Sequence, residues 1–233
     1  MLIKLYELAG AEENRRFSPY CWRIRMSLAH KGLAVDCLPW RFTEKEKIKF
    51  SGQERVPVLV DGDHTVSDSW QIAKYLEAEY PDKPSLKLEN GEVLFVKFWA
   101  ETVMTPVLLK FLLLDIHHSL TAKDKIYFRE SREKRFGKTL EEIVEGREDR
   151  LPDFQKTLTP LRLTLKKQKF VAGKSPGFSD YIVFGAFQWA RCISDFSLLQ
   201  PDDPIYEWRQ KMLRLHDELA GNAVGYSVLK RFR

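Results

Sequence analysis

The chain has 233 residues, of which 44% are hydrophobic and 30% are charged, a composition typical of a globular protein. Its 38 Lys and Arg residues are scattered among 33 Asp and Glu residues, so the net charge of +5 argues against a concentrated nucleic-acid-binding surface. The three cysteines (Cys21, Cys37 and Cys192) are too few and too widely spaced for a disulfide framework or a metal site, and they fit a reducing cytoplasm.

Two stretches bear on membrane insertion and targeting. The most apolar one, residues 103–116, is shorter than the roughly 20 residues that a membrane helix needs, and Pro106 and Lys110 interrupt it. The N-terminal residues lack the long apolar core of a signal peptide. We therefore expect no membrane association and a cytoplasmic location.

Residues 1–80 combine strand and helix patterns. Alternating apolar residues predict strands, Ser18-Pro19 is a helix-start signal, and Asp61-Gly62-Asp63 is a hairpin turn. The expected elements are a strand at 2–8, a helix at 18–32, a strand at 34–40, a hairpin at 56–66 and a helix at 67–80. This βαβ-ββα order predicts a small mixed sheet with helices packed against it.

Beyond residue 88 only helical patterns follow. Pro106 is expected to kink the first of these helices, and Ser179 and Asp180 are expected to cap an apolar helix at the centre of a second domain. The expected helices lie at 89–118, 122–136, 153–169, 179–195 and 204–220. We predict a domain at residues 1–81, a linker at 82–88 and an all-helical domain at 89–233.

Three motifs, in this order and spacing, resemble the glutathione transferase superfamily: SPYCWR at 18–23, RVPVLVDG at 55–62 and SDSWQIAKYL at 67–76. The resemblance implies a thioredoxin-like, glutathione-binding domain followed by an all-helical domain that contributes a hydrophobic substrate site. It also implies a homodimer by analogy, with glutathione as co-substrate and no metal.

A narrower resemblance rests on residues 41–60, 68–82 and 145–152, the last reading EGREDRLP. These stretches are similar to the bacterial β-etherases and the related fungal etherase-like transferases. Those enzymes use glutathione to break aryl ether bonds of lignin-derived dimers. This likeness supports membership of the class better than it supports that particular substrate.

Ser18 has two interpretations. From the pattern alone it is a helix cap, whereas the resemblance implies that its hydroxyl stabilises the thiolate of glutathione at the positive end of a helix. Cys21, one helical turn further on, is either a small buried hydrophobe or a residue for glutathione-linked disulfide exchange. A redox dithiol would need a second cysteine at position 18, three residues before Cys21, but that position is Ser18.

The resemblance implies ligand contacts at two further pairs. The backbone of Val56, held before a cis Pro57, would pair with the cysteinyl part of glutathione; the alternative is an ordinary strand start. Asp68 would take the ammonium of the γ-glutamyl group and Ser69 its carboxylate, or the pair only caps a helix.

The glycine carboxylate of glutathione needs a cation. The candidates are Lys45, Lys47, Lys49 and Arg55, and the sequence alone leaves the choice among them open.

The resemblance implies a glutathione transferase acting on a hydrophobic aromatic electrophile, with aryl ethers as one candidate class. The electrophile is expected between the domains, beside aromatic residues of the helical half. Two alternatives remain open at this stage. One is a non-catalytic protein that binds glutathione or aromatic ligands, and the other is a thiol-disulfide oxidoreductase acting through Cys21.

Overall fold

Four strands near the N-terminus form one mixed sheet in the order β2-β1-β3-β4. In the computed structural model, which describes residues 2–227, β1 pairs in parallel with β2 and antiparallel with β3, and β3 pairs antiparallel with β4. The strands are β1 (Ile3–Leu8), β2 (Val35–Trp40), β3 (Val58–Asp61) and β4 (His64–Ser67). The expected βαβ-ββα arrangement is confirmed.

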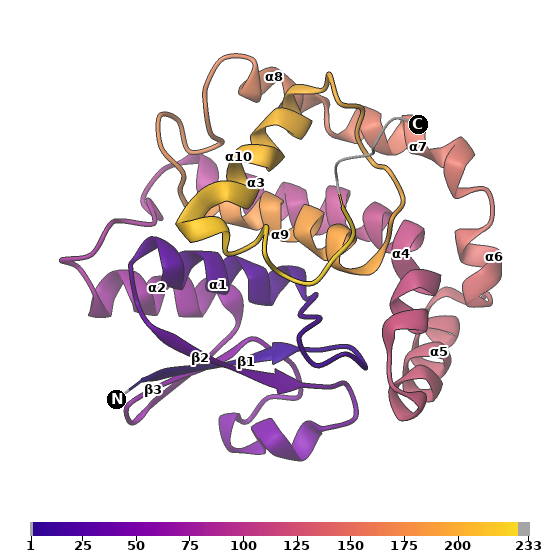
Figure 1. The fold of residues 1–233 in the computed structure, drawn as a ribbon, viewed down its shortest axis with the longest axis horizontal. Coiled ribbons are helices and arrows are strands. Elements are labelled where there is room, and N and C mark those ends of the chain that lie inside the picture. The colour runs from indigo at the N-terminus through magenta and orange to yellow at the C-terminus, as the bar shows by residue number, and fades with distance from the viewer. Residues whose placement is uncertain (1, 228–233) are drawn as a thin grey trace.

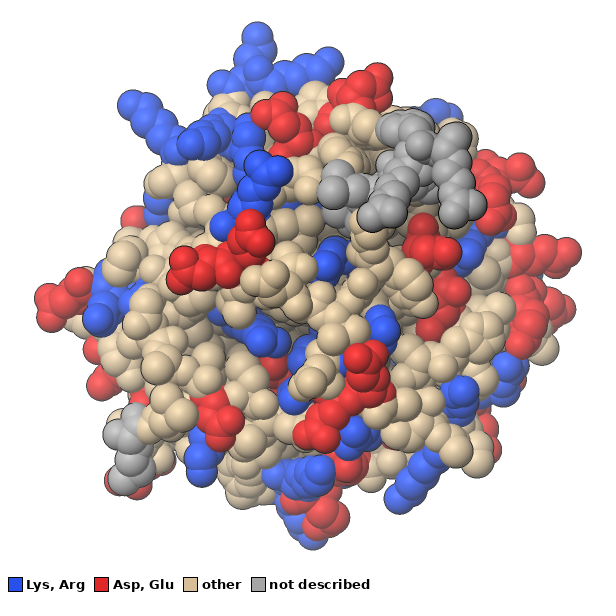
Figure 2. All heavy atoms as spheres, in the orientation of Figure 1, with Lys and Arg blue, Asp and Glu red and all other residues tan. Residues whose placement is uncertain are grey.

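Two helices, α1 (Pro19–His30) and α2 (Ser69–Glu79), lie between this sheet and the helical half of the molecule (Figure 1). The apolar residues of α1 face inward, and Ile24 and Leu28 are fully buried. A 3₁₀-helical segment, η1 (Lys45–Ser51), lies on the other side of the sheet and was not expected from the sequence. Figure 2 shows acidic and basic side chains interspersed over most of one face, as their nearly balanced numbers lead one to expect.

The rest of the described chain is helical, which confirms the expected fold class of a thioredoxin-like domain followed by an all-α domain. Its helices are α3 (Glu92–Trp99), the π-helical η2 (Ala100–Met104), α4 (Thr105–Ser119), α5 (Ala122–Phe136), α6 (Leu140–Val144), α7 (Arg147–Thr157), α8 (Thr159–Leu165), α9 (Phe178–Ile193) and α10 (Pro204–Glu218). The segment between α2 and α3 contains the stretch predicted as a linker. None of the helices described is long and apolar enough to cross a membrane.

Several details of the helical domain differ from the sequence prediction, and the helix expected at 89–118 consists of α3, η2 and α4. The helix expected at 153–169 is two helices, α7 and α8, which meet at Leu158 where Pro160 starts a new first turn. Helix α6 was missed. The cap of α9 is Gly177 rather than Ser179, because the carboxylate of Asp180 accepts a hydrogen bond from the Gly177 N–H at 3.1 Å.

Helix α9 is the centre of the helical domain, and Arg191 alone among its residues is not buried. It also packs along α1 and so joins the two domains (Figure 1). Asp180, fully buried, accepts hydrogen bonds from the Val171 N–H at 2.7 Å and from the indole N–H of Trp208 at 2.9 Å. This carboxylate ties α9 to α10 and to the loop that precedes α9.

Candidate functional site

The register of the sheet gathers the three motif segments at one edge. Val58 of β3 pairs with Tyr6 near the end of β1 and with Ser67 at the end of β4. The loop that leads from β1 to α1, the residues just before β3 and the start of α2 therefore converge there. The topology brings together the beginning of α1, the Val-Pro pair and the start of α2.

Ser18 is the N-cap of α1, as the Ser-Pro signal predicts. It has extended φ/ψ angles of −62° and 127°, and its hydroxyl oxygen accepts a hydrogen bond from the Cys21 N–H at 3.3 Å. Pro19 occupies the first turn, and the first turn of α1 contains no acidic residue. A negative charge beside Ser18 would therefore meet the positive end of the helix without opposition from that turn.

Val56 precedes Pro57 across a cis peptide bond. Val56 is half-buried, and neither its N–H nor its carbonyl has a hydrogen-bond partner within residues 2–227. A residue with both backbone groups unpaired can pair with the backbone of a bound peptide.

Asp68 caps α2 and adopts a positive φ of 70°, which is rare for a residue with a side chain. One oxygen of its carboxylate accepts hydrogen bonds from the N–H groups of Trp70 at 2.9 Å and Gln71 at 3.2 Å. Its other oxygen, and the hydroxyl of the largely buried Ser69, have no partner in the described part of the chain. The helix cap expected at this pair is thus present, and polar atoms remain available beside it.

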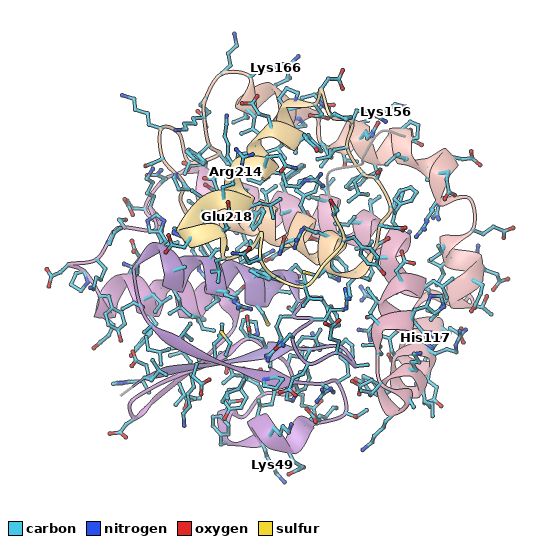
Figure 3. All side chains as sticks on the ribbon, in the orientation of Figure 1. Lys49, His117, Lys156, Lys166, Arg214 and Glu218 are labelled. Atoms are coloured by element: carbon cyan, nitrogen blue, oxygen red, sulfur yellow. The ribbon has the colours of Figure 1, made fainter. Side chains whose placement is uncertain are left out.

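The four candidate cations differ in their partners. Lys45, Lys47 and Lys49 form ion pairs with Glu54, Glu44 and Glu46 at 2.7, 2.9 and 3.2 Å, respectively. Lys49 also projects from η1 away from the rest of the molecule (Figure 3). Arg55 is exposed, lies next to Val56 and forms no ion pair with any described residue.

Tyr20, in the first turn of α1, belongs to this region although sequence reasoning did not single it out. Burial raises the pKa of its phenol, and the charges of Arg23, Glu101, Asp68 and Arg55 act on it as well. Its hydroxyl therefore stays protonated at neutral pH. The signal that could have found it is its position in the Ser-Pro-Tyr motif.

A buried ion pair holds this turn of α1 against the helical domain. The guanidinium of Arg23, which is 1% exposed, donates to Glu101 of η2 at 2.7 Å and lies 4.5 Å from the centre of the Tyr20 ring. Lys97 also binds Glu101, at 2.7 Å. Glu101 thus connects η2 to the first turns of α1, and π-helical segments are often found at functional sites.

Cys21 lies beneath the site rather than in it. The residue is 1% exposed, and burial raises the pKa of its thiol to about 12, with Glu7 adding to the rise and a hydrogen bond from Ser18 opposing it. A thiol in such surroundings is protonated at neutral pH and is not accessible to a substrate.

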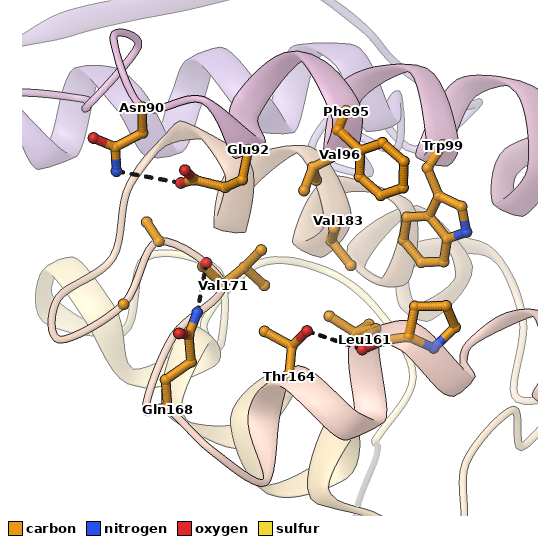
Figure 4. Close-up of a pocket in the computed structure, with 13 residues that line it drawn as sticks. Asn90, Glu92, Phe95, Val96, Trp99, Leu161, Thr164, Gln168, Val171 and Val183 are labelled. Atoms are coloured by element: carbon orange, nitrogen blue, oxygen red, sulfur yellow. Dashed lines mark hydrogen bonds between the residues drawn. The ribbon is translucent and has the colours of Figure 1, made fainter.

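A pocket of about 360 Å³ opens in the helical domain, between α3, α8 and the loop before α9 (Figure 4). Phe95, Trp99 and Leu161 line it together with the amide of Gln168. All its lining residues belong to the helical half, and Ser18 is not among them. The hydrophobic cleft expected between the domains is therefore a different location from this pocket.

Comparison with known proteins identifies both halves of the chain. Residues 14–84 match the family described as "Glutathione S-transferase, N-terminal domain", and residues 92–197 match "Glutathione S-transferase, C-terminal domain". A glutathione S-transferase 1 of Dianthus caryophyllus is 29% identical over 138 residues, which are 55% of this chain and 62% of that protein. The chain thus spans less than two thirds of this relative's length.

Solved structures of two fungal proteins have similar folds. A glutathione S-transferase of Ceriporiopsis subvermispora in complex with glutathione superposes with a TM-score of 0.79 at 21% identity, covering 94% of this chain and 97% of that one. Glutathione transferase GSTFuA2 of Phanerochaete chrysosporium has a TM-score of 0.74 at 26% identity, covering 94% and 93%.

Proposed function

This chain belongs to the glutathione S-transferase superfamily, and from that premise we propose that it is a glutathione transferase in which Ser18 stabilises the thiolate of bound glutathione. The observation that carries the proposal is the position of Ser18 at the N-terminus of α1, at the sheet edge where the Val56-Pro57 and Asp68-Ser69 pairs also lie.

Each part of glutathione has a matching group at this edge. The unpaired backbone of Val56 suits the cysteinyl amide, and the unpaired atoms of Asp68 and Ser69 suit the ammonium and carboxylate of the γ-glutamyl end. Arg55 is the best candidate for the glycine carboxylate, since each of the three lysines already pairs with a glutamate. These contacts would direct the sulfur towards Ser18.

In the proposed reaction the thiol loses its proton to solvent and the thiolate attacks an electrophilic carbon. A carbon–sulfur bond forms, and the leaving group departs with the electron pair of the broken bond. The hydroxyl of Ser18 and the end of α1 stabilise the anion before attack, while the binding contacts hold sulfur and carbon in the productive orientation. Tyr20, in the same turn, adds an aromatic ring and a protonated hydroxyl.

The proposed electrophile is a hydrophobic aromatic compound, and aryl ethers are the specific class that the etherase-like stretches favour. The GREDRLP stretch has a structural role: Arg147 pairs with Asp115 of α4 at 2.7 Å, and Arg150 donates to the Ile143 carbonyl at 2.8 Å. These contacts are within the helical domain, so the aryl-ether class rests on the sequence resemblance alone.

We also propose a homodimer. Leu94, Phe95, Phe98 and Val103 are exposed large apolar side chains along α3 and η2, and exposed apolar patches often mark protein–protein interfaces. Sedimentation velocity of the purified protein tests this. A dimer that Phe98→Glu converts to a monomer supports the assignment, and a monomeric unaltered protein contradicts it.

The catalytic proposal is tested by Ser18→Ala. Conjugation of 1-chloro-2,4-dinitrobenzene is expected to fall by about tenfold or more, which corresponds to about 1.4 kcal/mol, while calorimetric binding of glutathione persists. Ser27→Ala is the matched control, because this buried serine of the same helix donates to the Arg23 carbonyl and lies away from the site.

Other outcomes separate the alternatives. If Ser18→Ala conjugates as fast as the unaltered protein, Ser18 only caps the helix. If glutathione binds but no aryl halide, quinone or aryl ether is turned over, the protein is a binding protein. Comparing turnover of these three substrate classes, with and without glutathione, tests whether aryl ethers are cleaved.

A further inference from the structure

Three side chains from three helices meet at the end of α1 that is remote from Ser18. His30 is the last residue of α1, Tyr181 lies in the first turn of α9, and His216 lies near the end of α10. The hydroxyl oxygen of Tyr181 is 2.6 Å from Nδ1 of His30 and 3.1 Å from Nε2 of His216. The centres of the two imidazole rings are 5.9 Å apart. These three residues are called the His30–Tyr181–His216 cluster below.

The two imidazoles present one nitrogen each to the same point. Both nitrogens face the Tyr181 oxygen, so they converge as two ligands of one metal ion do. Imidazole nitrogen is a common ligand for zinc, copper and nickel. After small rotations of the side chains, an ion between the rings would exchange the two hydrogen bonds for two metal–nitrogen bonds of about 2.0–2.1 Å.

Both rings are in the protonation state that metal binding requires, because a ligating imidazole must be neutral. Burial lowers the pKa of both histidines, that of His30 to about 4, so both are neutral at pH 7. Each ring is nevertheless only half-buried and can be reached from solvent. The ring of His30 also donates a hydrogen bond to the Ser85 backbone. Histidine ligands usually donate their second ring N–H in this way, which fixes the tautomer.

The backbone that carries His216 is strained. His216, Asp217 and Glu218 have φ angles of 54°, 56° and 58°, so three successive residues with side chains lie in the left-handed region. Such residues normally occur singly, because the Cβ atom crowds the following carbonyl oxygen. Strained backbone is concentrated at binding and catalytic sites. Here the unfavourable turn begins at the residue that supplies the second imidazole.

The charges beside the cluster also favour a cation. Asp217 and Glu218 follow His216, are exposed at the end of α10 (Figure 3), and form no ion pair within residues 2–227. The charge of Asp217 acts on the ring of His216. On the other side, Lys31 follows His30, and its charge is neutralised by Glu77 at 2.7 Å.

The number of protein ligands limits the affinity that such a site can have. No group of three or more His, Cys, Asp or Glu side chains among the residues described is arranged to hold a metal ion. A site here therefore has two imidazole ligands, with the phenol oxygen and water to complete the shell. For a site with nitrogen and oxygen ligands the affinity order favours Cu²⁺ over Zn²⁺.

From this arrangement we propose that the His30–Tyr181–His216 cluster binds one divalent transition-metal ion, Cu²⁺ more tightly than Zn²⁺, through Nδ1 of His30 and Nε2 of His216. The bound ion would link α1 to α10 and so hold the two domains together. It takes no part in the proposed glutathione transfer, for which the sequence resemblance implies no metal. The proposal does not depend on that function.

The test is calorimetric titration of the full-length protein, free of any affinity tag and stripped of metal by a chelator, with ZnCl₂, CuCl₂ and MgCl₂. Zinc is expected to bind with one-to-one stoichiometry, and copper about tenfold or more tightly than zinc. Magnesium prefers oxygen ligands and should show no saturable binding. Absence of saturable binding of zinc and copper, or equal binding of magnesium, overturns the proposal.

His30→Asn and His216→Asn are each expected to weaken zinc binding by about tenfold or more. His64→Asn is the matched control, because this exposed histidine of β4 lies outside the cluster and its loss should leave zinc binding unchanged. Zinc should raise the unfolding temperature of the unaltered protein and of the control, but not that of His216→Asn. Equal zinc binding by all three variants contradicts the proposed ligands.

The described residues contain one other pair of neighbouring imidazoles, His117 and His118, whose ring centres are also 5.9 Å apart. Loss of zinc binding in His117→Asn, with binding retained in His216→Asn, would assign the ion to that pair and overturn the proposal. If the cluster variants do not fold, electron paramagnetic resonance of Cu²⁺ bound to His117→Asn decides. Hyperfine coupling to two imidazole nitrogens supports the proposed site, and coupling to one or none contradicts it.

Discussion

Gly185 of α9 lies directly against Pro19 of α1. A Cβ atom added at Gly185 would be 2.4 Å from the Pro19 carbonyl oxygen, a distance that real Cβ atoms essentially never show. The backbone of the central helix of one domain therefore sets the position of the first turn of α1 in the other. Ser18, which caps that turn, depends on this contact although it is distant from Gly185 in sequence.

Gly185→Ala is accordingly expected to cost about 1–3 kcal/mol of unfolding free energy through overpacking. Because the neighbouring atoms are backbone, the first turn of α1 must shift, and we expect the turnover number for aryl conjugation to fall more than the affinity for glutathione. Gly91→Ala is the control, since a Cβ there meets no atom within 4 Å. Unchanged turnover and stability in Gly185→Ala would show that α1 and α9 can separate freely.

Arg55 is expected to act in binding rather than in chemistry. Arg55→Met should raise the KM for glutathione by about tenfold, since hydrogen bonds to charged groups contribute about 1.5–3 kcal/mol, and should leave kcat nearly unchanged. Lys47→Met is the control, because Lys47 pairs with Glu44 in η1. Steady-state kinetics with varied glutathione measures this difference, and a larger KM effect in Lys47→Met would reassign the glycine carboxylate to η1.

Cys21 is expected to be dispensable for the transferase reaction. Its buried, protonated thiol should not react with an aromatic disulfide reagent in the native protein, but should react after unfolding in denaturant. Cys21→Ala should keep conjugation activity and lose about 1–2 kcal/mol of stability from the cavity it leaves. Rapid modification of native Cys21, together with disulfide reductase activity that Cys21→Ser removes, would instead favour the oxidoreductase alternative.

Local signals in the sequence predicted most of the fold. The alternation in residues 2–8, the Ser-Pro start of α1 and the Asp-Gly turn before β4 depend on neighbours in the chain, and each element formed as expected. The misses have local causes as well. Helix α6 spans five residues, too few to show a helical period, and η1 is a 3₁₀ segment whose lysine-rich sequence reads as a solvated loop.

The candidate site divides in the same way. Ser18, Val56 and Asp68 could be found because each lies in a short motif. The charged surroundings of Tyr20 could not be predicted from the sequence. They include the ion pair between Arg23 and Glu101, which are 78 positions apart in the chain. The burial of Cys21 likewise results from the packing of α1 between the sheet and α9. A local sequence pattern does not contain information on that packing.

Three titratable side chains connect the two domains at the other end of α1. The hydroxyl of Tyr181 lies 2.6 Å from Nδ1 of His30 and 3.1 Å from Nε2 of His216. The pKa of His30 is lowered from 6.5 to about 4, chiefly by burial; the nearby His216 and Lys31 also lower it, whereas Glu77 and a hydrogen bond that the ring donates to the Ser85 backbone act in the opposite direction. Burial also lowers the pKa of His216.

A histidine whose folded pKa lies below its unfolded pKa contributes stability that is intact above about pH 6.5 and is lost as the pH falls towards 4. The unfolded chain binds the proton in this window and the folded chain does not. We expect the unfolding free energy to drop there by roughly 1–2 kcal/mol from His30, a value reduced because the ring is only partly buried. His30→Asn should flatten this part of the pH profile in denaturant titrations between pH 4 and 7.5. Tyr181→Phe, which keeps both imidazoles, should retain the slope, and a His30→Asn profile as steep as that of the unaltered protein would assign the acid sensitivity to other groups.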